Sequence, residues 1–305
     1  MLTIKNYAAI DIGSNAVRLL IANIFEQEGQ EPIFKKRSLV RVPIRLGADV
    51  FLGAKISDKN IQRMLDTMTA FRLLMNSHNI EHYRACATSA MREASNGAEI
   101  AKLIHQKAKI KIDIIDGNDE AAIIAATDLH SLIKSDKNYL YVDVGGGSTE
   151  FTFYAKGHTI DSQSFKLGTV RILDENLDID MWESVENWIK KVTKPYTKIE
   201  LIGSGGNINH IYKSSGKTIG KPLSYFYLSS YYQMLQTLSF EERITQLNMN
   251  VDRADVIIPA TKIYLSAMKW SRSSKIFVPK IGLADGVVKS LYNEIKARDL
   301  KINTN

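Results

Sequence analysis

A strand-turn-strand pattern occurs twice in the sequence, and this repetition constrains the fold more than any other feature. The first copy, AAIDIGSNAVRLLIANI, begins at residue 8, and the second, LYVDVGGGSTEFTFYAKG, begins at residue 140. Each copy places an Asp-x-Gly sequence between two apolar runs, with Asp11 and Asp143 at corresponding positions. Self-similarity at the spacing of one lobe indicates a duplicated architecture.

The segments after each copy alternate between strands and helices. From Ser57 to His78, apolar residues recur every three or four positions, which indicates an amphipathic helix with Ser57 as its N-cap. Alternation of this kind is typical of parallel sheets with crossover helices, so we predict an α/β fold. Further strands are expected at 82–88, 110–116, 159–166, 198–204 and 275–279, and further helices at 97–107, 118–134, 181–194, 206–215, 252–271 and 283–299.

The length of 305 residues suffices for two lobes, each with a substantial core. No Pro-rich or Gly/Ser linker separates them, so the boundary is expected within or beside the helix at 118–134. We therefore place an N-terminal lobe at residues 1–122 and a C-terminal lobe at residues 123–305. The closing helix at 283–299 is a candidate to dock back on the first lobe.

Composition excludes several classes of function. No apolar run reaches the roughly 20 residues of a membrane span, and the N-terminus lacks the pattern of a secretory signal. A lone cysteine, Cys86, fits a reducing compartment, so a cytoplasmic protein without a membrane partner is expected. The net charge of +7 permits an anionic partner, but no aromatic and basic ladder is present, so nucleic acid is not expected.

The two hairpin turns carry the parts of a phosphate site. Glycines let backbone N–H groups converge on an anion, and Ser14, Ser148 and Thr149 add hydroxyl groups. A third glycine-rich segment, LIGSGGNI, leads from a strand into a helix and could direct the helix N-terminus at phosphate. One such turn alone is typically structural, but two at corresponding places favour a site in a cleft between the lobes. Because carboxylates repel phosphate, Asp11 and Asp143 indicate Mg²⁺ or a positioned water between them and the anion.

Three other segments each allow two interpretations. In DGNDEAAIIAATDLH, with Asn118 as the predicted N-cap, Glu120 either complements the helix dipole or serves as general base for a water molecule. Arg92, in CATSAMREASN, is either a solvated surface charge or a phosphate clamp. The segment KSSGKTIGK at 213–221 is either a surface loop or a track for a polyanion.

Together these segments resemble the exopolyphosphatase and guanosine pentaphosphate phosphohydrolase family, within the superfamily of actin, sugar kinases and heat-shock ATPases. The resemblance implies two duplicated ribonuclease-H-like lobes, as in actin-like ATPases, with an interlobe cleft. It also implies Mg²⁺-dependent hydrolysis of the terminal phosphate of inorganic polyphosphate or of the 5′ γ-phosphate of guanosine pentaphosphate, and a homodimer. It rests on AAIDIGSNAVRLLI, RLG at 45–47, ATSAMREASN, IIDGNDEA, YVDVGGGSTEF, LGTVRI at 167–172, GSGGNI and RADVIIPA at 253–260.

The resemblance also assigns roles to individual residues. It implies that Glu120 is the catalytic glutamate and that Asp143 and Glu150 hold the metal. The residues expected to bind phosphate are Asp11, Gly13, Ser14, Asn15, Arg92, Gly145, Gly146, Gly147, Ser148, Thr149, Gly205 and Gly206.

The sequence departs from the family pattern at two positions and in length. Asn207 stands where a threonine is usual, and Ala122 stands where a larger residue is frequent. Longer family members carry an additional C-terminal helical domain, so a preference for short phosphate chains or low processivity is expected here. Two other functions would use the same parts: an ATP-using kinase of the same superfamily, and a non-enzymatic sensor of guanosine polyphosphates.

Overall fold

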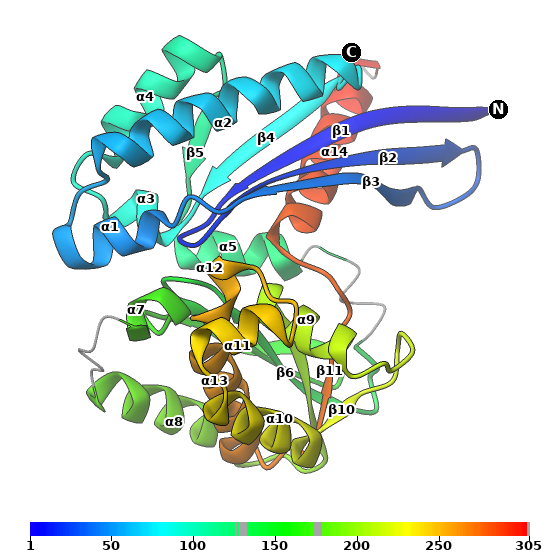
Figure 1. Cartoon of the computed structure of the whole chain (residues 1–305). Helices are drawn as coiled ribbons and strands as arrows, with labels where there is room; N and C mark the ends of the chain where they lie inside the picture. The colour runs from blue at the N-terminus through cyan, green and yellow to red at the C-terminus, as the bar shows by residue number, and fades with distance from the viewer. Residues whose placement is uncertain (126, 128–132, 174–178, 304–305) are drawn as a thin grey trace. The chain divides into compact units, whose positions relative to one another are not determined.

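The computed structural model describes residues 1–125, 127, 133–173 and 179–303, which form two compact units (Figure 1). The first unit comprises Met1–Thr127 and Leu283–Asn305, and the second comprises Asp128–Gly282. Residues 283–305 thus belong to the first unit. The sequence had placed them in the C-terminal lobe, with the closing helix as a candidate to dock on the first lobe. Of the helix predicted at 118–134, the structure describes α5 (Gly117–Ala125), and residues 126 and 128–132 lie outside the described part.

The first unit is built on a five-stranded sheet in the order β3-β2-β1-β4-β5. Strand β1 pairs antiparallel with β2 and parallel with β4. The strands are β1 (Leu2–Ile12), β2 (Val17–Gln27), β3 (Ile33–Val42), β4 (His82–Ala87) and β5 (Ile112–Ile114). The helices are α1 (Leu46–Gly53), α2 (Asp58–Ser77), α3 (Ser89–Glu93), α4 (Gly97–Ala108), α5 and α14 (Leu283–Asn303).

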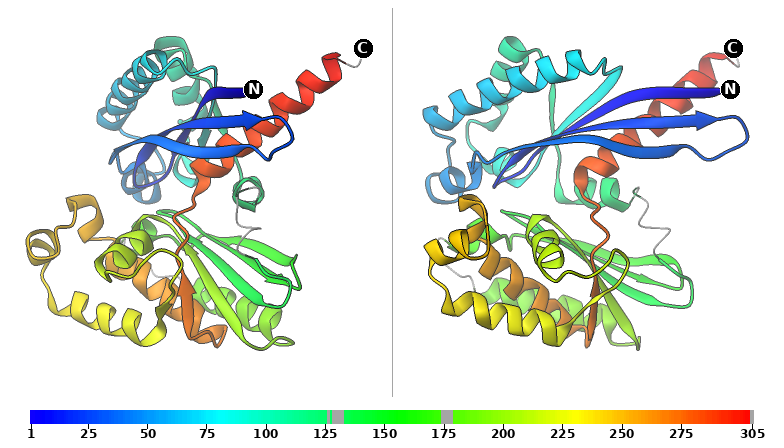
Figure 2. Two further views of the ribbon diagram at one scale, coloured as in Figure 1. Left: turned by 90° about the vertical axis from the view of Figure 1, so that its right-hand side faces the viewer. Right: turned by 45° about the vertical axis from the view of Figure 1, so that its right-hand side comes forward.

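Helices cover both faces of this sheet. On one face, Met64 and Met68 of α2 and Ile104 of α4 join Ile10 and Leu19 in one buried core. Helix α14 lies on the other face, as Figure 2 shows. Its Tyr292 ring packs against the rings of Tyr7 and Phe34. The predicted N-cap of α2 is confirmed, because the Ser57 side chain accepts a hydrogen bond from the Asn60 N–H.

The second unit has a six-stranded sheet in the order β10-β11-β9-β6-β7-β8. Strand β6 pairs antiparallel with β7 and parallel with β9, as β1 does with β2 and β4. The strands are β6 (Asn138–Val144), β7 (Thr149–Ala155), β8 (His158–Phe165), β9 (Ile199–Ser204), β10 (Leu223–Ser224) and β11 (Lys275–Phe277). The helices are α7 (Thr169–Leu173), α8 (Ile179–Thr193), α9 (Gly206–Ser214), α10 (Tyr225–Thr237), α11 (Phe240–Thr245), α12 (Val251–Ala254) and α13 (Ile257–Trp270).

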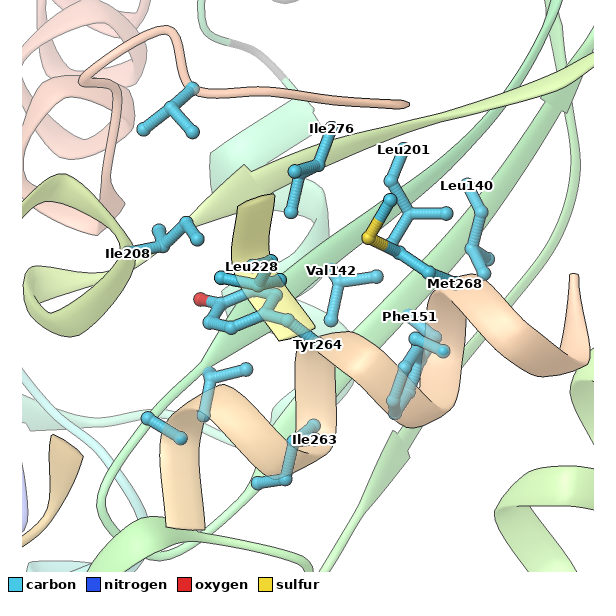
Figure 3. Close-up of a cluster of buried hydrophobic side chains, with 14 of the residues drawn as sticks. Leu140, Val142, Phe151, Leu201, Ile208, Leu228, Ile263, Tyr264, Met268 and Ile276 are labelled. Carbon is cyan, nitrogen blue, oxygen red and sulfur yellow. The ribbon is translucent and has the colours of Figure 1, made fainter. Parts of the chain in front are cut away.

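The core of the second unit forms where α13 packs on the sheet (Figure 3). Val142 and Leu201 project from neighbouring strands toward Tyr264 and Met268 of α13, and all four side chains are buried. At about 25 cal/mol per Å² of buried apolar surface, such a cluster is the main favourable contribution to folding. Helices α10 and α11 were not predicted, although Leu228, Tyr231 and Leu235 recur at helical spacing in α10 and are buried.

The register of the two hairpins confirms the predicted duplication. In the first hairpin Ile12 pairs with Val17, and the Gly13 N–H donates to the Ala16 carbonyl at 3.2 Å. In the second, Val144 pairs with Thr149, and the Gly145 N–H donates to the Ser148 carbonyl at 3.0 Å. Both turns therefore have four residues and the same closing hydrogen bond, and an aspartate stands one residue before the strand end in each.

In the described residues no helix is long and apolar enough to cross a membrane.

Candidate active site

The predicted site residues of the first unit gather where its parallel strands end. The turn at 13–16 follows β1, helix α3 with Arg92 follows β4, and helix α5 with Glu120 follows β5. The carboxyl ends of β1, β4 and β5 share one edge of the sheet, which is the usual position of ligand sites in α/β folds. Backbone hydrogen bonds tie the three ends together, since the Thr88 N–H donates to Ile12 and the Ile115 N–H donates to Ala87.

The first turn is held from two sides. Its carbonyls at Ser14 and Asn15 accept hydrogen bonds from the Gly47 and Arg45 N–H groups, at 2.8 and 3.0 Å. The hydroxyls of Ser14 and Ser89 lie 3.0 Å apart, and both side chains are buried. Because a trans peptide points its N–H opposite to its C=O, the Asn15 and Ala16 N–H groups face away from the segment at 45–47. The turn is thus fixed with two N–H groups directed away from its support.

Asp11 lies in an ion pair that was not predicted. Arg18, its partner in the register of β1 and β2, places Nη1 at 2.6 Å from Asp11 Oδ2. The aspartate is 4% exposed, so the charge of Arg18 stabilises a carboxylate that burial would otherwise penalise. Arg18 thus provides a compensating positive charge for Asp11 within the hairpin itself.

Replacing Arg18 by Met is expected to lower the free energy of unfolding by about 2 kcal/mol, because it leaves the buried Asp11 carboxylate without its cation. Urea denaturation would measure the loss. The double variant with Asp11→Asn should recover part of it, since removing both charges leaves no unpaired ion. If the double variant is no more stable than the single one, the ion pair is not what stabilises this hairpin.

Glu120 lies in the first turn of α5, where its N–H donates to the Asp116 carbonyl at 3.0 Å. The predicted cap at Asn118 is wrong: the Asp116 carboxylate accepts from the Asn118 and Asp119 N–H groups, each at 2.8 Å. Beside this cap, Arg92 Nη1 donates to the Ile115 carbonyl at 2.6 Å, so the arginine and Glu120 come from adjoining segments.

The buried Cys86 lies opposite Asp11, as its register partner in the parallel pair of β1 and β4. Burial raises the pKa of Cys86 to about 12, and the charges of Asp113, Asp11 and Glu120 add to the rise. The thiol is therefore protonated at neutral pH, as expected for a structural cysteine and not for a nucleophile.

The second turn, at residues 145–148, has all three glycine carbonyls bound to one neighbouring segment. The Gly145 carbonyl accepts from the Thr169 N–H, and the Gly146 carbonyl accepts from the Val170 N–H at 2.8 Å. Arg171 Nε donates to the Gly147 carbonyl at 3.0 Å. By the same peptide geometry, the N–H groups of Gly146, Gly147 and Ser148 face away from α7. Successive N–H groups aligned in this way form a concave donor set for an anion.

Gly145 serves close packing in the second turn. Neither Gly13 nor Gly145 has a positive φ, but a Cβ on Gly145 would lie 2.9 Å from the Ser148 carbonyl oxygen. Thr149, predicted to bind phosphate, is fully buried and its hydroxyl donates to the Leu167 carbonyl. That hydroxyl thus anchors the turn to the segment before α7.

Asp143 and Glu150 face each other across the strands that flank the second turn, as register partners of β6 and β7. Glu150 is 2% exposed and accepts a hydrogen bond from Ser164 Oγ at 2.8 Å. Two buried tyrosines, Tyr141 and Tyr264, lie near Asp143, and their pKa values are raised well above 10 by burial first and then by the Asp143 charge. Two neutral phenols thus lie near the aspartate.

This pair of carboxylates suits Mg²⁺, a hard cation that proteins bind through one or two carboxylates together with substrate phosphates. The described residues contain no group of three or more His, Cys, Asp or Glu side chains placed to hold a metal alone. Water molecules and phosphate oxygens would supply the remaining ligands.

The third glycine loop adjoins the second turn. Gly205 has a φ of +118°, and a Cβ there would lie 2.9 Å from the Val144 carbonyl oxygen and 3.6 Å from Asp143 Oδ1. The Tyr264 hydroxyl donates to the Ser204 carbonyl, which fixes this approach. The N-terminus of α9, with Gly206, thus begins beside Asp143. The two half-sites lie in different units, and the cleft expected between them stays a prediction.

The model of the Ppx/GppA phosphatase family matches residues 21–294. The chain belongs to this family. Among curated relatives it is 35% identical, over 65% of its length, to the bifunctional 3-dehydroquinate synthase/phosphatase of Fusobacterium nucleatum. It is 26% identical, over 98% of its length, to the guanosine-5′-triphosphate,3′-diphosphate pyrophosphatase of Photobacterium profundum. The chain covers 32% and 61% of these two proteins.

Solved structures of the Ppx/GppA family share the fold. A crystal structure of an exopolyphosphatase from Cytophaga hutchinsonii superimposes with a TM-score of 0.81 at 23% identity, covering 95% of this chain and 98% of that one. The predicted α/β class with two similar lobes is thereby confirmed.

Sequence reasoning missed the residues that support the site. Arg18 and Arg171 lie in the quoted motifs, but arginine is usually a surface residue and nothing local identifies its partner. Gly168 was quoted in LGTVRI without a role, although a Cβ there would lie 2.3 Å from the Gly146 carbonyl oxygen. Only the three-dimensional contact identifies such residues.

Proposed function

We propose that the chain is an exopolyphosphatase that hydrolyses the terminal phosphate of inorganic polyphosphate, or the 5′ γ-phosphate of guanosine pentaphosphate. The observation that carries the proposal is the matched pair of turns, each with its carbonyls bound to a neighbouring segment and its N–H groups turned the other way. Membership of the Ppx/GppA phosphatase family supports it, as do relatives named exopolyphosphatase and guanosine-5′-triphosphate,3′-diphosphate pyrophosphatase. We further propose a cytoplasmic homodimer.

In the proposed reaction, water attacks the terminal phosphorus in line with the bond to the bridging oxygen. Glu120 accepts the proton of that water, and the N–H groups of both turns with Arg92 hold the phosphoryl oxygens. The bridging oxygen leaves with the shortened chain, and orthophosphate is the other product. Mg²⁺, held by Asp143 and Glu150, would supply neutralisation of phosphate charge. Catalysis in such reactions depends mainly on positioning and electrostatics, and these are what the rigid turns provide.

Phosphate release by the purified protein tests the proposal. Tripolyphosphate, long-chain polyphosphate, guanosine pentaphosphate and ATP would each be offered with Mg²⁺ and with excess EDTA. We expect release from polyphosphate or guanosine pentaphosphate that EDTA abolishes and added Mg²⁺ restores. Release that persists in EDTA would remove the metal from the proposal.

The same panel separates hydrolysis from the two rival functions. A kinase of this superfamily would turn over ATP only with a phosphoryl acceptor, and a sensor would bind guanosine polyphosphates without releasing phosphate. Glu120, which lies in the family's motif, favours hydrolysis over the kinase. The acidic residues of the site argue against the sensor, because binding alone gains nothing from carboxylates beside phosphate.

A further inference from the structure

A hollow of about 410 Å³ in the second unit is lined by three lysines and lies outside the residues assigned above. Its lining consists of Lys217, Thr218, Lys221, Pro222, Ser224 and Lys275. Two of these lysines belong to the loop between α9 and β10, yellow-green in Figure 1, and the third begins β11. All three are exposed, so their ammonium groups can meet a ligand from solvent.

The floor of the hollow is fixed by the sheet. Ser224 and Lys275 are register partners in the antiparallel pair of β10 and β11. The next residue, Tyr225, donates its N–H to the Ser274 carbonyl at 2.9 Å. Ser224 is also the N-cap of α10, where its side chain accepts from the Tyr227 N–H.

The wall of the hollow is an ordered loop. The buried Tyr212 hydroxyl bonds two loop carbonyls, those of Thr218 and Lys221, and the Lys221 N–H donates to Thr218 at 3.1 Å. Lys217 Nζ donates to the Pro222 carbonyl at 2.7 Å, so one ammonium group is fixed against another residue of the lining. Gly216 and Gly220 take the positive φ values that the loop's turns require. The lysines are therefore presented by a fixed backbone.

The two chain segments that line the hollow carry only positive charges. The segments 201–240 and 256–284, which contain the whole lining, hold no Asp or Glu, and every charged residue in them is Lys or Arg. Glu200, which precedes the first segment, is paired with Lys137 at 3.0 Å. Like charges clustered without acids raise the local concentration of anions.

Helix α9 connects this hollow to the third glycine loop. Gly206 begins the helix, and the loop with Lys217 follows its other end. Nine residues of α-helix are roughly 13 Å long. A ligand in contact with both ends must therefore be an extended anion, and a single phosphate or tripolyphosphate is too short to serve both.

We propose that the hollow lined by Lys217, Lys221 and Lys275 is a second binding site for a phosphate chain, which holds the distal part of a long inorganic polyphosphate. The inference rests on the proposed function for the nature of the ligand. The site binds by charge and carries out no reaction. It favours capture of long chains over short ones.

Substitution of the three lysines by Gln tests the site, with Lys191→Gln, Lys194→Gln and Lys269→Gln as a control of equal charge at exposed positions outside the hollow. The variant with all three lysines of the hollow replaced, the pocket variant, should raise KM for long-chain polyphosphate roughly tenfold. Each exposed ion contact contributes a few-fold to the affinity. The kcat, and the KM for tripolyphosphate, should stay unchanged. The double variant Lys221→Gln with Lys275→Gln keeps the Lys217 contact to Pro222, so it shows the effect with the loop intact.

Direct binding separates this site from the proposed activity. Long-chain polyphosphate and GTP would be titrated into the pocket and control variants at several salt concentrations. We expect the pocket variant alone to bind polyphosphate more weakly and with a smaller salt dependence. Equal losses in both variants, or a loss for GTP without one for polyphosphate, would overturn the proposal. If the wild-type protein releases no phosphate, the enzyme assignment fails, and this titration still decides the lysine site.

Discussion

Glu120→Gln is expected to lower kcat by about 10²–10⁴-fold, the usual contribution of a general base. Gln keeps the size of the side chain and its place in the first turn of α5, but it cannot take a proton from water. Substrate binding depends on the turns and Arg92, so KM should change little. Steady-state phosphate release with the best substrate of the panel measures both constants.

The neighbouring Asp119→Asn is the matched control, since it removes one negative charge from the same helical turn at an exposed position. It should leave kcat within about twofold, as surface changes usually do. Equal losses in the two variants would point to the helix dipole. Normal turnover by the Gln variant would reject Glu120 as the base.

The duplicated hairpin could be read from the sequence because its information is local. An aspartate, a glycine turn and two apolar runs lie within about 17 consecutive letters each time, and both copies form the same four-residue turn. The helix at Asp58–Ser77 was likewise visible, because one amphipathic period and a serine cap define it. Local signals of this kind survive tertiary packing.

The residues that support the site could not be predicted from the sequence, because their roles depend on strand register and on contacts between distant parts of the chain. Arg18 meets Asp11 only because the four-residue turn sets that pairing, and a turn one residue longer would break it. Asn118 and Asp116 are both good caps, and the choice between them depends on where α5 begins. Arg171 reaches a carbonyl 24 positions earlier in the chain.

Gly168→Ala is expected to be a strongly damaging substitution in the second unit. A Cβ at this position would lie 2.3 Å from the Gly146 carbonyl oxygen and 2.4 Å from the Gly147 carbonyl carbon. Both atoms are backbone, so the turn or the start of α7 must move, and the peptide planes rotate with it. Loss of one preorganised N–H donor typically costs about 10²–10³-fold in kcat, and several donors of this turn are set together.

Phosphate release and thermal unfolding of Gly168→Ala, side by side, separate a displaced turn from a failure to fold. We expect a folded protein with strongly reduced kcat/KM, destabilised by about 1–3 kcal/mol from overpacking. Gly53→Ala is the control, because a Cβ at the end of α1 meets nothing within 4 Å, and its kcat/KM should match wild type. A stable Gly168→Ala enzyme with full activity would mean that the N–H groups of residues 146–148 do not hold the phosphate, and the phosphate site would have to be sought at the first turn and the N-terminus of α9.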